Sequence, residues 1–181
     1  MDTIGTNAAL DTALLRQLQE YDWTGWTDWM PFLDLDFKKV KAEPGAYVLS
    51  TNGPINRAIG TDPMGILDIG EAGKGKATLR GRLKAMRRCM TKRGDTGHMA
   101  AWRFAFFRFE RHYPHSSLRI RWIPAATKKE AQNYEGRMML TYLLRHSELP
   151  PLNYQFNWQP FKEIGWRVFD DAACFGGGDM S

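Results

Sequence analysis

Short apolar runs of strand length occur at several places along the chain. Two of them, 46–50 and 65–70, are separated by turn-forming residues and predict an antiparallel hairpin with an enlarged loop. In 118–123, apolar side chains alternate with arginines, which predicts another strand. The segment 102–109 begins with the alternating run W-R-F-A-F and then changes phase, which predicts a strand with a bulge.

Three other segments carry apolar residues at helical spacing. They are 8–20, 78–92 and 127–145, and the last opens with the capping box Thr127-Lys128-Lys129-Glu130. Tryptophan or phenylalanine recurs at every third position from Trp23 to Phe32, which predicts an irregular or short helical element packed on the core. These patterns predict an α+β fold with a small central antiparallel β-sheet flanked by helices.

A chain of 181 residues fits one domain, and no repeat or linker divides it. We expect 1–43 to form a helix and a Trp-rich elaboration on a core that spans 44–153. We expect 154–175 to extend that domain and 176–181 to be a disordered tail.

The two cysteines, Cys89 and Cys174, match no zinc or redox spacing, which favours a reducing compartment. The first residues lack the basic and apolar regions of a signal peptide, and no apolar run approaches membrane-spanning length. These features predict a soluble, cytoplasmic protein.

Positive charge is concentrated in one segment. Between Lys74 and Arg93 there are nine lysines and arginines and no acid, and subtracting them from the net charge of +5 leaves −4 for the remaining residues. Such a segment is typical of binding to a phosphate backbone, although a solvated helix face without a partner is the alternative. We expect nucleic acid to be bound by Lys74, Lys76, Arg80, Lys84, Arg87 and Arg88.

Two charged residues occupy apolar helix faces. Glu135 lies four residues after Ala131 and three before Met138, and Arg82 lies between Leu79 and Met86 in the same way. A charge on a buried face is costly unless it is paired or binds a ligand. The two residues therefore predict either a buried salt bridge or a phosphodiesterase site, in which Glu135 holds a divalent cation and Arg82 the phosphate.

Several motifs resemble, in their order, those of the GIY-YIG nuclease superfamily. Gly45-Ala46-Tyr47 stands in the place of Gly-Ile-Tyr, and Asp68-Ile69-Gly70 in the place of Tyr-Ile-Gly. The run L-R-G-R-L at 79–83 is similar to the helix that carries the family's arginine, and E-G-R-M-M-L at 135–140 is similar to the helix that carries its glutamate. The run P-L-N at 151–153 is similar to the family's closing motif. The resemblance covers about 45–153.

The resemblance implies an endonuclease that hydrolyses phosphodiester bonds in duplex or branched DNA with one Mg²⁺ or Mn²⁺. Tyr47 would activate the attacking water, helped by the metal and by nearby lysines that lower its pKa. Arg82 would bind the phosphate, Glu135 would bind the metal, and Asn153 would fix the structure beside the site. A homodimer or a partner protein would supply double-strand cleavage or specificity.

The chain departs from the family pattern at two positions. Asp68 replaces the second motif's tyrosine, where it could add a carboxylate near the metal, point away, or mark a weakened catalyst. Met86 stands four residues after Arg82, where some members have His or Tyr; His98 could substitute, but we expect this loop histidine to be exposed.

Two other functions remain open on sequence grounds. One is a catalytically inactive nucleic-acid-binding protein that keeps the fold and the basic helix. The other is a P-loop nucleotide hydrolase, because 70–76 fits G-x-x-x-x-G-K, although Ala77 stands where Ser or Thr is required.

Overall fold

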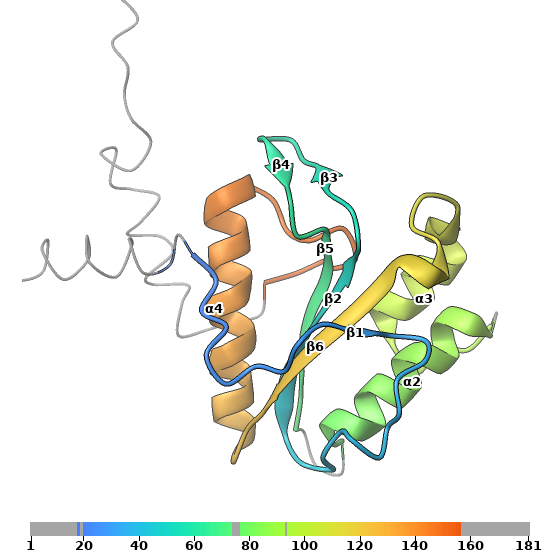
Figure 1. The fold of residues 1–181 in the computed structure, drawn as a ribbon, viewed down its shortest axis with the longest axis vertical. Coiled ribbons are helices and arrows are strands. Elements are labelled where there is room, and N and C mark those ends of the chain that lie inside the picture. The colour runs from blue at the N-terminus through green and yellow to red at the C-terminus, as the bar shows by residue number, and fades with distance from the viewer. Residues whose placement is uncertain (1–17, 19, 74–76, 93, 157–181) are drawn as a thin grey trace, which may run out of the picture.

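A four-stranded antiparallel sheet runs through the centre of the computed structural model, which describes residues 18, 20–73, 77–92 and 94–156 (Figure 1). The strand order is β1-β6-β2-β5, and a separate small hairpin pairs β3 with β4. The strands are β1 Met30–Pro31, β2 Gly45–Thr51, β3 Ile55–Asn56, β4 Thr61–Asp62, β5 Ile66–Ala72 and β6 Leu118–Pro124. The predicted strands 46–50, 65–70 and 118–123 are confirmed as β2, β5 and β6, whereas β1 and the β3–β4 hairpin were not predicted.

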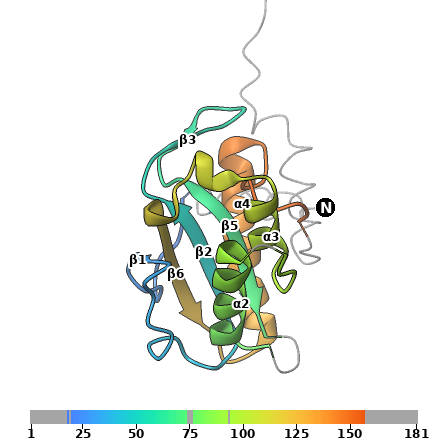
Figure 2. The same cartoon turned by 90° about the vertical axis from the view of Figure 1, so that its right-hand side faces the viewer.

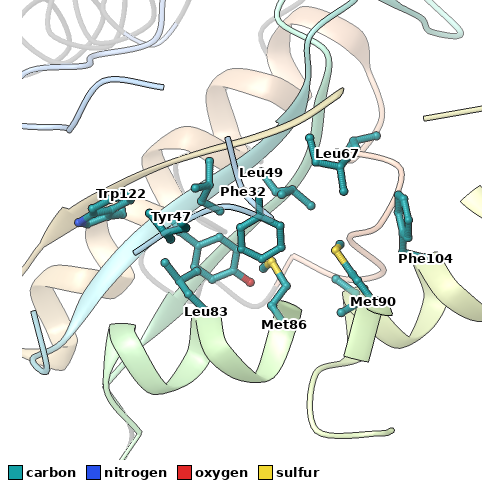
Figure 3. Close-up of a cluster of buried hydrophobic side chains, with 14 of the residues drawn as sticks. Phe32, Tyr47, Leu49, Leu67, Leu83, Met86, Met90, Phe104 and Trp122 are labelled. Atoms are coloured by element: carbon teal, nitrogen blue, oxygen red, sulfur yellow. The ribbon is translucent and has the colours of Figure 1, made fainter. Parts of the chain in front are cut away.

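Helices cover both faces of the sheet, which confirms the predicted α+β fold. Helix α4 (Lys128–His146) lies on one face, and α2 (Leu79–Thr91) and α3 (Met99–Phe106) lie on the other (Figure 1). The side chains of β2 alternate between two buried clusters: Tyr47 and Leu49 pack with α2 and α3, whereas Ala46 and Val48 pack with α4. Figure 3 shows Tyr47 pointing from β2 toward α2, beside Leu83 and Met86.

Threonine side chains start the two longer helices. The hydroxyl of Thr78 accepts a hydrogen bond from the Gly81 N–H at 3.1 Å, and the hydroxyl of Thr127 accepts one from the Glu130 N–H at 3.1 Å. Each bond satisfies a backbone donor that the first helical turn leaves unpaired. The predicted helices 78–92 and 127–145 are thereby confirmed as α2 and α4, with ends that differ by one residue.

The predicted strand at 102–109 is wrong, because most of this segment belongs to α3 and to the short 3₁₀ helix Phe109–Arg111. Ala100, Ala101 and Phe104 are the buried residues of α3, which is a helical spacing. Trp102 and Phe106, four residues apart, stack with their ring centroids 4.8 Å apart. The alternation over five residues was too short to distinguish a strand from a helix.

The Trp-rich segment is irregular up to β1 and packs on the core, as predicted. Trp26 is buried, and Trp23 and Trp29 pack with it against the cluster on the α4 side of the sheet. The predicted helix 8–20 and the extension 154–175 lie largely outside the described residues, and the tail 176–181 lies wholly outside them. In the part of the chain that the structure describes, no helix is both long enough and apolar enough to cross a membrane.

Candidate active site

A cavity of about 340 Å³ opens at the edge of the sheet formed by β5. Because β5 has only one neighbour among the described strands, residues from α2 on one face and α4 on the other can approach each other beside it (Figure 2). The cavity is lined by the five site residues that the sequence indicated, namely Tyr47, Asp68, Arg82, Glu135 and Asn153. Residues from β2, β5, α2, α4 and the segment after α4 thus converge at one place.

Two glycines make room for this arrangement. Gly70 lies directly opposite Tyr47 in the β2–β5 pair, and a Cβ atom at Gly70 would lie 2.5 Å from Cζ of Tyr47 and closer still to its hydroxyl. A Cβ atom at Gly45 would lie 2.9 Å from Cδ2 of Leu79 and would also overlap the Ile123 carbonyl. Glycine at these two motif positions is therefore a steric requirement of the strands and of the Tyr47 ring.

The Tyr47 hydroxyl stands in the middle of a chain of buried hydrogen bonds. It donates to Oδ2 of Asp68 at 2.9 Å and lies 3.0 Å from Nε2 of His98. His98 caps α3, where its Nδ1 accepts from the Ala101 N–H at 3.4 Å. Because Nδ1 accepts, the ring proton of neutral His98 is on Nε2 and is donated to Tyr47. Donation therefore runs from α3 through His98 and Tyr47 to Asp68.

The exposure expected for His98 is wrong, since the side chain is only 1% exposed. The error has a physical cause: His98 precedes a segment that was predicted to be a strand but is a helix, so its role as an N-cap could not be foreseen. Burial, followed by the charge of Arg82, lowers the pKa of His98 to about 3, so the ring is neutral at pH 7.

The carboxyl group of Asp68 faces the same cavity and is 3% exposed. Burial raises its pKa to about 7, although the Tyr47 hydroxyl and the charges of Arg82 and Arg103 act in the opposite direction. Burial, and next the charge of Asp68, raise the pKa of Tyr47 well above its ordinary value. The phenol is therefore protonated at neutral pH, and the lowered pKa that the resemblance implied, which depends on the metal and on nearby lysines, stays a prediction.

Glu135 reaches the cavity from the opposite face of the sheet and accepts a hydrogen bond from the backbone N–H of Glu71. Burial raises its pKa to about 8, and the nearby carboxylates of Glu71 and Asp68 raise it further than Arg82 lowers it. The salt bridge that was the alternative reading is absent, since none of the ion pairs among the described residues joins Arg82 to Glu135. The Nε of Arg82 is buried without a hydrogen-bond partner.

The carboxylates at this site fit a hydrated divalent cation. Among the described residues there is no group of three His, Cys, Asp or Glu side chains placed to enclose an ion. Mg²⁺, however, keeps several waters and is commonly held by one or two carboxylates. Glu135 has such a carboxylate, and the acidic neighbours that raise its pKa would be stabilised by a positive ion. Glu135 is the residue that would hold Mg²⁺ or Mn²⁺.

Asn153 fixes the chain beside the cavity. Its amide nitrogen donates to the Ile69 carbonyl at 2.8 Å, and its side-chain oxygen accepts from the Ile69 N–H at 3.0 Å. The Leu152 N–H also donates to the Leu67 carbonyl at 2.9 Å. These bonds occupy backbone groups of the edge strand β5, which would otherwise be open to another strand.

Comparison with known proteins gave no match. No family model, curated protein or solved structure is similar enough to this chain to be identified as a relative. The assignment of roles to the residues of the cavity therefore rests on this chain's own motifs and geometry.

Several arginines of the basic segment bind the protein's own chain. Nε of Arg80 donates to the Val40 carbonyl at 2.6 Å, and Arg87 donates to the carbonyls of Leu33 and Leu35 at 3.0 and 3.2 Å. The guanidinium of Arg87 also lies 4.1 Å from the ring centroid of Phe37. Arg80 and Arg87 thus hold the N-terminal segment against α2, a role that the charge pattern did not reveal.

The other residues predicted to bind nucleic acid differ in their surroundings. Arg88 forms an ion pair with Asp95, and Lys84 is exposed on α2. Lys74 and Lys76 lie outside the described residues. Binding of nucleic acid by this segment stays a prediction, for which Lys84 is the clearest candidate on the described part of α2.

The sequence analysis did not select Lys128 and Gln132, which also line the cavity. They lie seven and three residues before Glu135 on α4, so helical spacing alone places them on the same face. Met99 and Tyr154 line the cavity as well. Met99 could not be selected, because α3 was not predicted.

The P-loop alternative finds no support in the sheet. P-loop strands belong to parallel sheets with helical crossovers. Every pairing among the described strands is antiparallel, and β5 is paired to β2 as a hairpin.

Proposed function

We propose that the protein is a metal-dependent endonuclease of the GIY-YIG type that hydrolyses phosphodiester bonds in DNA. The observation that carries this proposal is the convergence of the Tyr47 hydroxyl, the Arg82 guanidinium and the Glu135 carboxylate on one open cavity. The three groups come from different elements, and they match the three roles that phosphodiester hydrolysis requires: activation of water, binding of the phosphate and binding of a metal.

Arg82 is suited to hold the scissile phosphate. Its Nε is buried and has no hydrogen-bond partner among the described residues, and a buried donor without a partner is costly. A phosphate oxygen would satisfy this donor and would add charge-assisted hydrogen bonds. Lys128, at the start of α4, lines the same cavity and adds a second positive charge for the phosphate.

Tyr47 and Asp68 together provide the proton acceptor. The Tyr47 hydroxyl already donates to Asp68, so it can accept a proton from water as its own proton moves to Oδ2 of Asp68. The water oxygen then forms its bond to phosphorus, the bond from phosphorus to the leaving oxygen breaks, and that oxygen takes a proton from solvent. His98 donates to Tyr47 from the other side and keeps the hydroxyl aimed at Asp68.

Glu135 completes the site from α4. When bound there, Mg²⁺ or Mn²⁺ would supply the positive charge that stabilises the leaving oxygen. Because the pKa of the Glu135 carboxyl is raised to about 8, the side chain is poorly ionised without a cation, and binding of the cation displaces its proton.

Cleavage of supercoiled plasmid and of a branched oligonucleotide in Mg²⁺, Mn²⁺ or EDTA tests the proposal. We expect cleavage in either metal, none in EDTA, and at least a hundredfold loss in Glu135→Gln. Glu43→Gln is the matched control, because Glu43 pairs with Lys41 at the surface and does not line the cavity. Undiminished cleavage by Glu135→Gln, or cleavage in EDTA, would contradict the assigned role of Glu135.

A nucleic-acid-binding protein without activity is the second candidate. The raised pKa of Tyr47 favours it, because the phenol stays protonated at neutral pH and little phenolate is available to activate water. This candidate predicts retention of DNA in a mobility-shift assay together with no cleavage by the wild-type protein in any metal.

A further inference from the structure

Two apolar side chains are exposed at the rim of the cavity. Tyr154 is 59% exposed and Met99 is 48% exposed, yet both line the cavity that also contains Arg82 and Glu135. The cavity between them also contains the cations Arg82 and Lys128, so the rim offers a ligand an aromatic ring beside positive charge. Exposed aromatic rings at such places are common in surfaces that bind single-stranded nucleic acid.

The chain around Tyr154 is held in place. Asn153, the preceding residue, makes two hydrogen bonds to Ile69 of β5. Arg103 of α3 donates to the Leu152 carbonyl at 3.1 Å, and its guanidinium lies 5.9 Å from the centroid of the Tyr154 ring. The ring therefore extends from an anchored peptide and is contacted by a cation, so little further ordering is required when a flat ligand stacks on it.

The ligand that fits both features is a nucleotide. A phosphate bound by Arg82 would place the attached sugar and base at the rim of the cavity, where the exposed ring offers a stacking surface. A base inside a continuous duplex is stacked on both of its neighbours, and its removal from the stack costs free energy that an unpaired base does not require. An aromatic platform beside the phosphate site therefore favours a substrate whose adjacent base is already unpaired.

We propose that Tyr154 stacks on the base of a nucleotide that flanks the scissile phosphate, and that the preferred substrate is DNA with an unpaired base at that position, such as a forked or bulged duplex. This inference rests on the proposed function, because it takes the phosphate at Arg82 to be the one that is cleaved. It goes further by naming the class of DNA and the residue that selects it.

Fluorescence of 2-aminopurine tests the stacking without requiring cleavage. Forked duplexes would carry 2-aminopurine at successive unpaired positions next to the fork, and binding would be measured in EDTA. We expect quenching at one position with the wild-type protein and with Tyr154→Phe, which keeps the ring. In Tyr154→Leu we expect no quenching and roughly 5- to 150-fold weaker binding of the forked duplex.

Phe107→Leu is the matched control. Phe107 is also an exposed aromatic residue, at 58%, but it lies at the far end of α3 from Met99 and does not line the cavity. This variant is expected to bind the forked duplex and to quench as the wild type does. Equal losses in Phe107→Leu and Tyr154→Leu would overturn the assignment, because they would show a general effect of exposed aromatic rings.

Failure of this inference can be separated from failure of the proposed function. If the wild type cleaves DNA but Tyr154→Leu keeps the same preference for forked over continuous duplex, the platform is refuted and the nuclease stands. If the wild type quenches 2-aminopurine but never cleaves, stacking at Tyr154 stands and the proposed hydrolysis fails. If the wild type binds neither forked nor continuous DNA, both are refuted.

Discussion

Replacement of Gly70 by alanine tests the geometry of the site independently of its function. The added Cβ atom would lie 2.5 Å from Cζ and 2.8 Å from Cε1 of Tyr47, whereas ordinary contacts of this kind are 3.4–4 Å. The Tyr47 ring would have to move by about 1 Å, yet its side chain is only 1% exposed and is tightly packed. The hydrogen bonds from Tyr47 to Asp68 and His98 would then be lost or lengthened.

The expected cost can be estimated from these contacts. Overpacking in a core costs about 1–3 kcal/mol, and each buried hydrogen bond that is lost adds about 1 kcal/mol. We expect Gly70→Ala to lower the free energy of unfolding by about 2–4 kcal/mol, measured by urea denaturation. Gly53→Ala is the control, because a Cβ atom there would contact nothing within 4 Å, and its expected effect is within about 1 kcal/mol.

A double-mutant cycle identifies the cause of the loss. In a Tyr47→Ala background the atoms that collide with the new Cβ are absent, so Gly70→Ala should cost less than about 0.5 kcal/mol. The interaction energy between the two positions would then be at least about 1.5 kcal/mol. If Gly70→Ala is tolerated in the wild-type background, or costs the same in both backgrounds, the steric argument for this motif glycine is wrong.

Four further variants test other parts of the structure by urea denaturation, and one of them also by DNA binding. His98→Gln removes a group whose pKa is lowered to about 3, so the free energy of unfolding of the wild type should fall by at most about 5 kcal/mol between about pH 6.5 and pH 3. The difference in stability between wild type and variant should shrink over that range, and a constant difference would contradict the buried, neutral histidine. Arg87→Ala should lower the free energy of unfolding by about 1–3 kcal/mol, because it loses hydrogen bonds to backbone carbonyls. Lys84→Ala should change that free energy by less than about 0.5 kcal/mol but should weaken DNA binding and reduce its salt dependence. The reverse pattern would refute the division of roles between the two residues. Asn153→Ala removes two bonds to the edge strand and should cost about 1–3 kcal/mol, so a cost below about 0.5 kcal/mol would show that these bonds do not hold the segment.

Three of the four strands of the central sheet, β2, β5 and β6, and the helices α2 and α4 could be predicted from local patterns. The strands β2 and β5 are buried on both faces because helices cover both sides of the sheet, and their short apolar runs indicate this burial. For α2 and α4, the threonine caps and the apolar spacing agree with each other. Agreement between independent local signals is what made these elements predictable.

Helix α3 could not be predicted, because its local signals conflict. Its sequence is rich in aromatic residues, which favour strands, and its apolar residues alternate for five positions. The contacts that decide in favour of a helix are distant in sequence: the cap is His98, whose ring is held by Tyr47, fifty-one residues away. Pairing across such a separation leaves no trace in the local pattern.

The local pattern also could not predict the roles of the basic residues on α2. Charge alone could not distinguish Arg87, which is committed to the carbonyls of Leu33 and Leu35, from Lys84, which is exposed one turn earlier. Both residues carry a positive charge on the same helix. Nζ of Lys84 also lies 5.9 Å from the ring centroid of Phe37 in the N-terminal segment, so the two residues are separated by the hydrogen bonds that Arg87 donates to that segment's carbonyls.

His98, on the other side of Tyr47, explains why an aspartate stands at position 68 in place of the second motif's tyrosine. With His98 donating to the phenol, the hydroxyl proton must point toward another acceptor, and Oδ2 of Asp68 lies 2.9 Å away. A tyrosine at position 68 would make a less effective acceptor than a carboxylate, and a charged His98 would lose Nδ1 as the acceptor that caps α3. The neutral histidine and the aspartate therefore depend on each other, which is why loss of the Asp68 carboxylate should disturb Tyr47 as much as loss of His98.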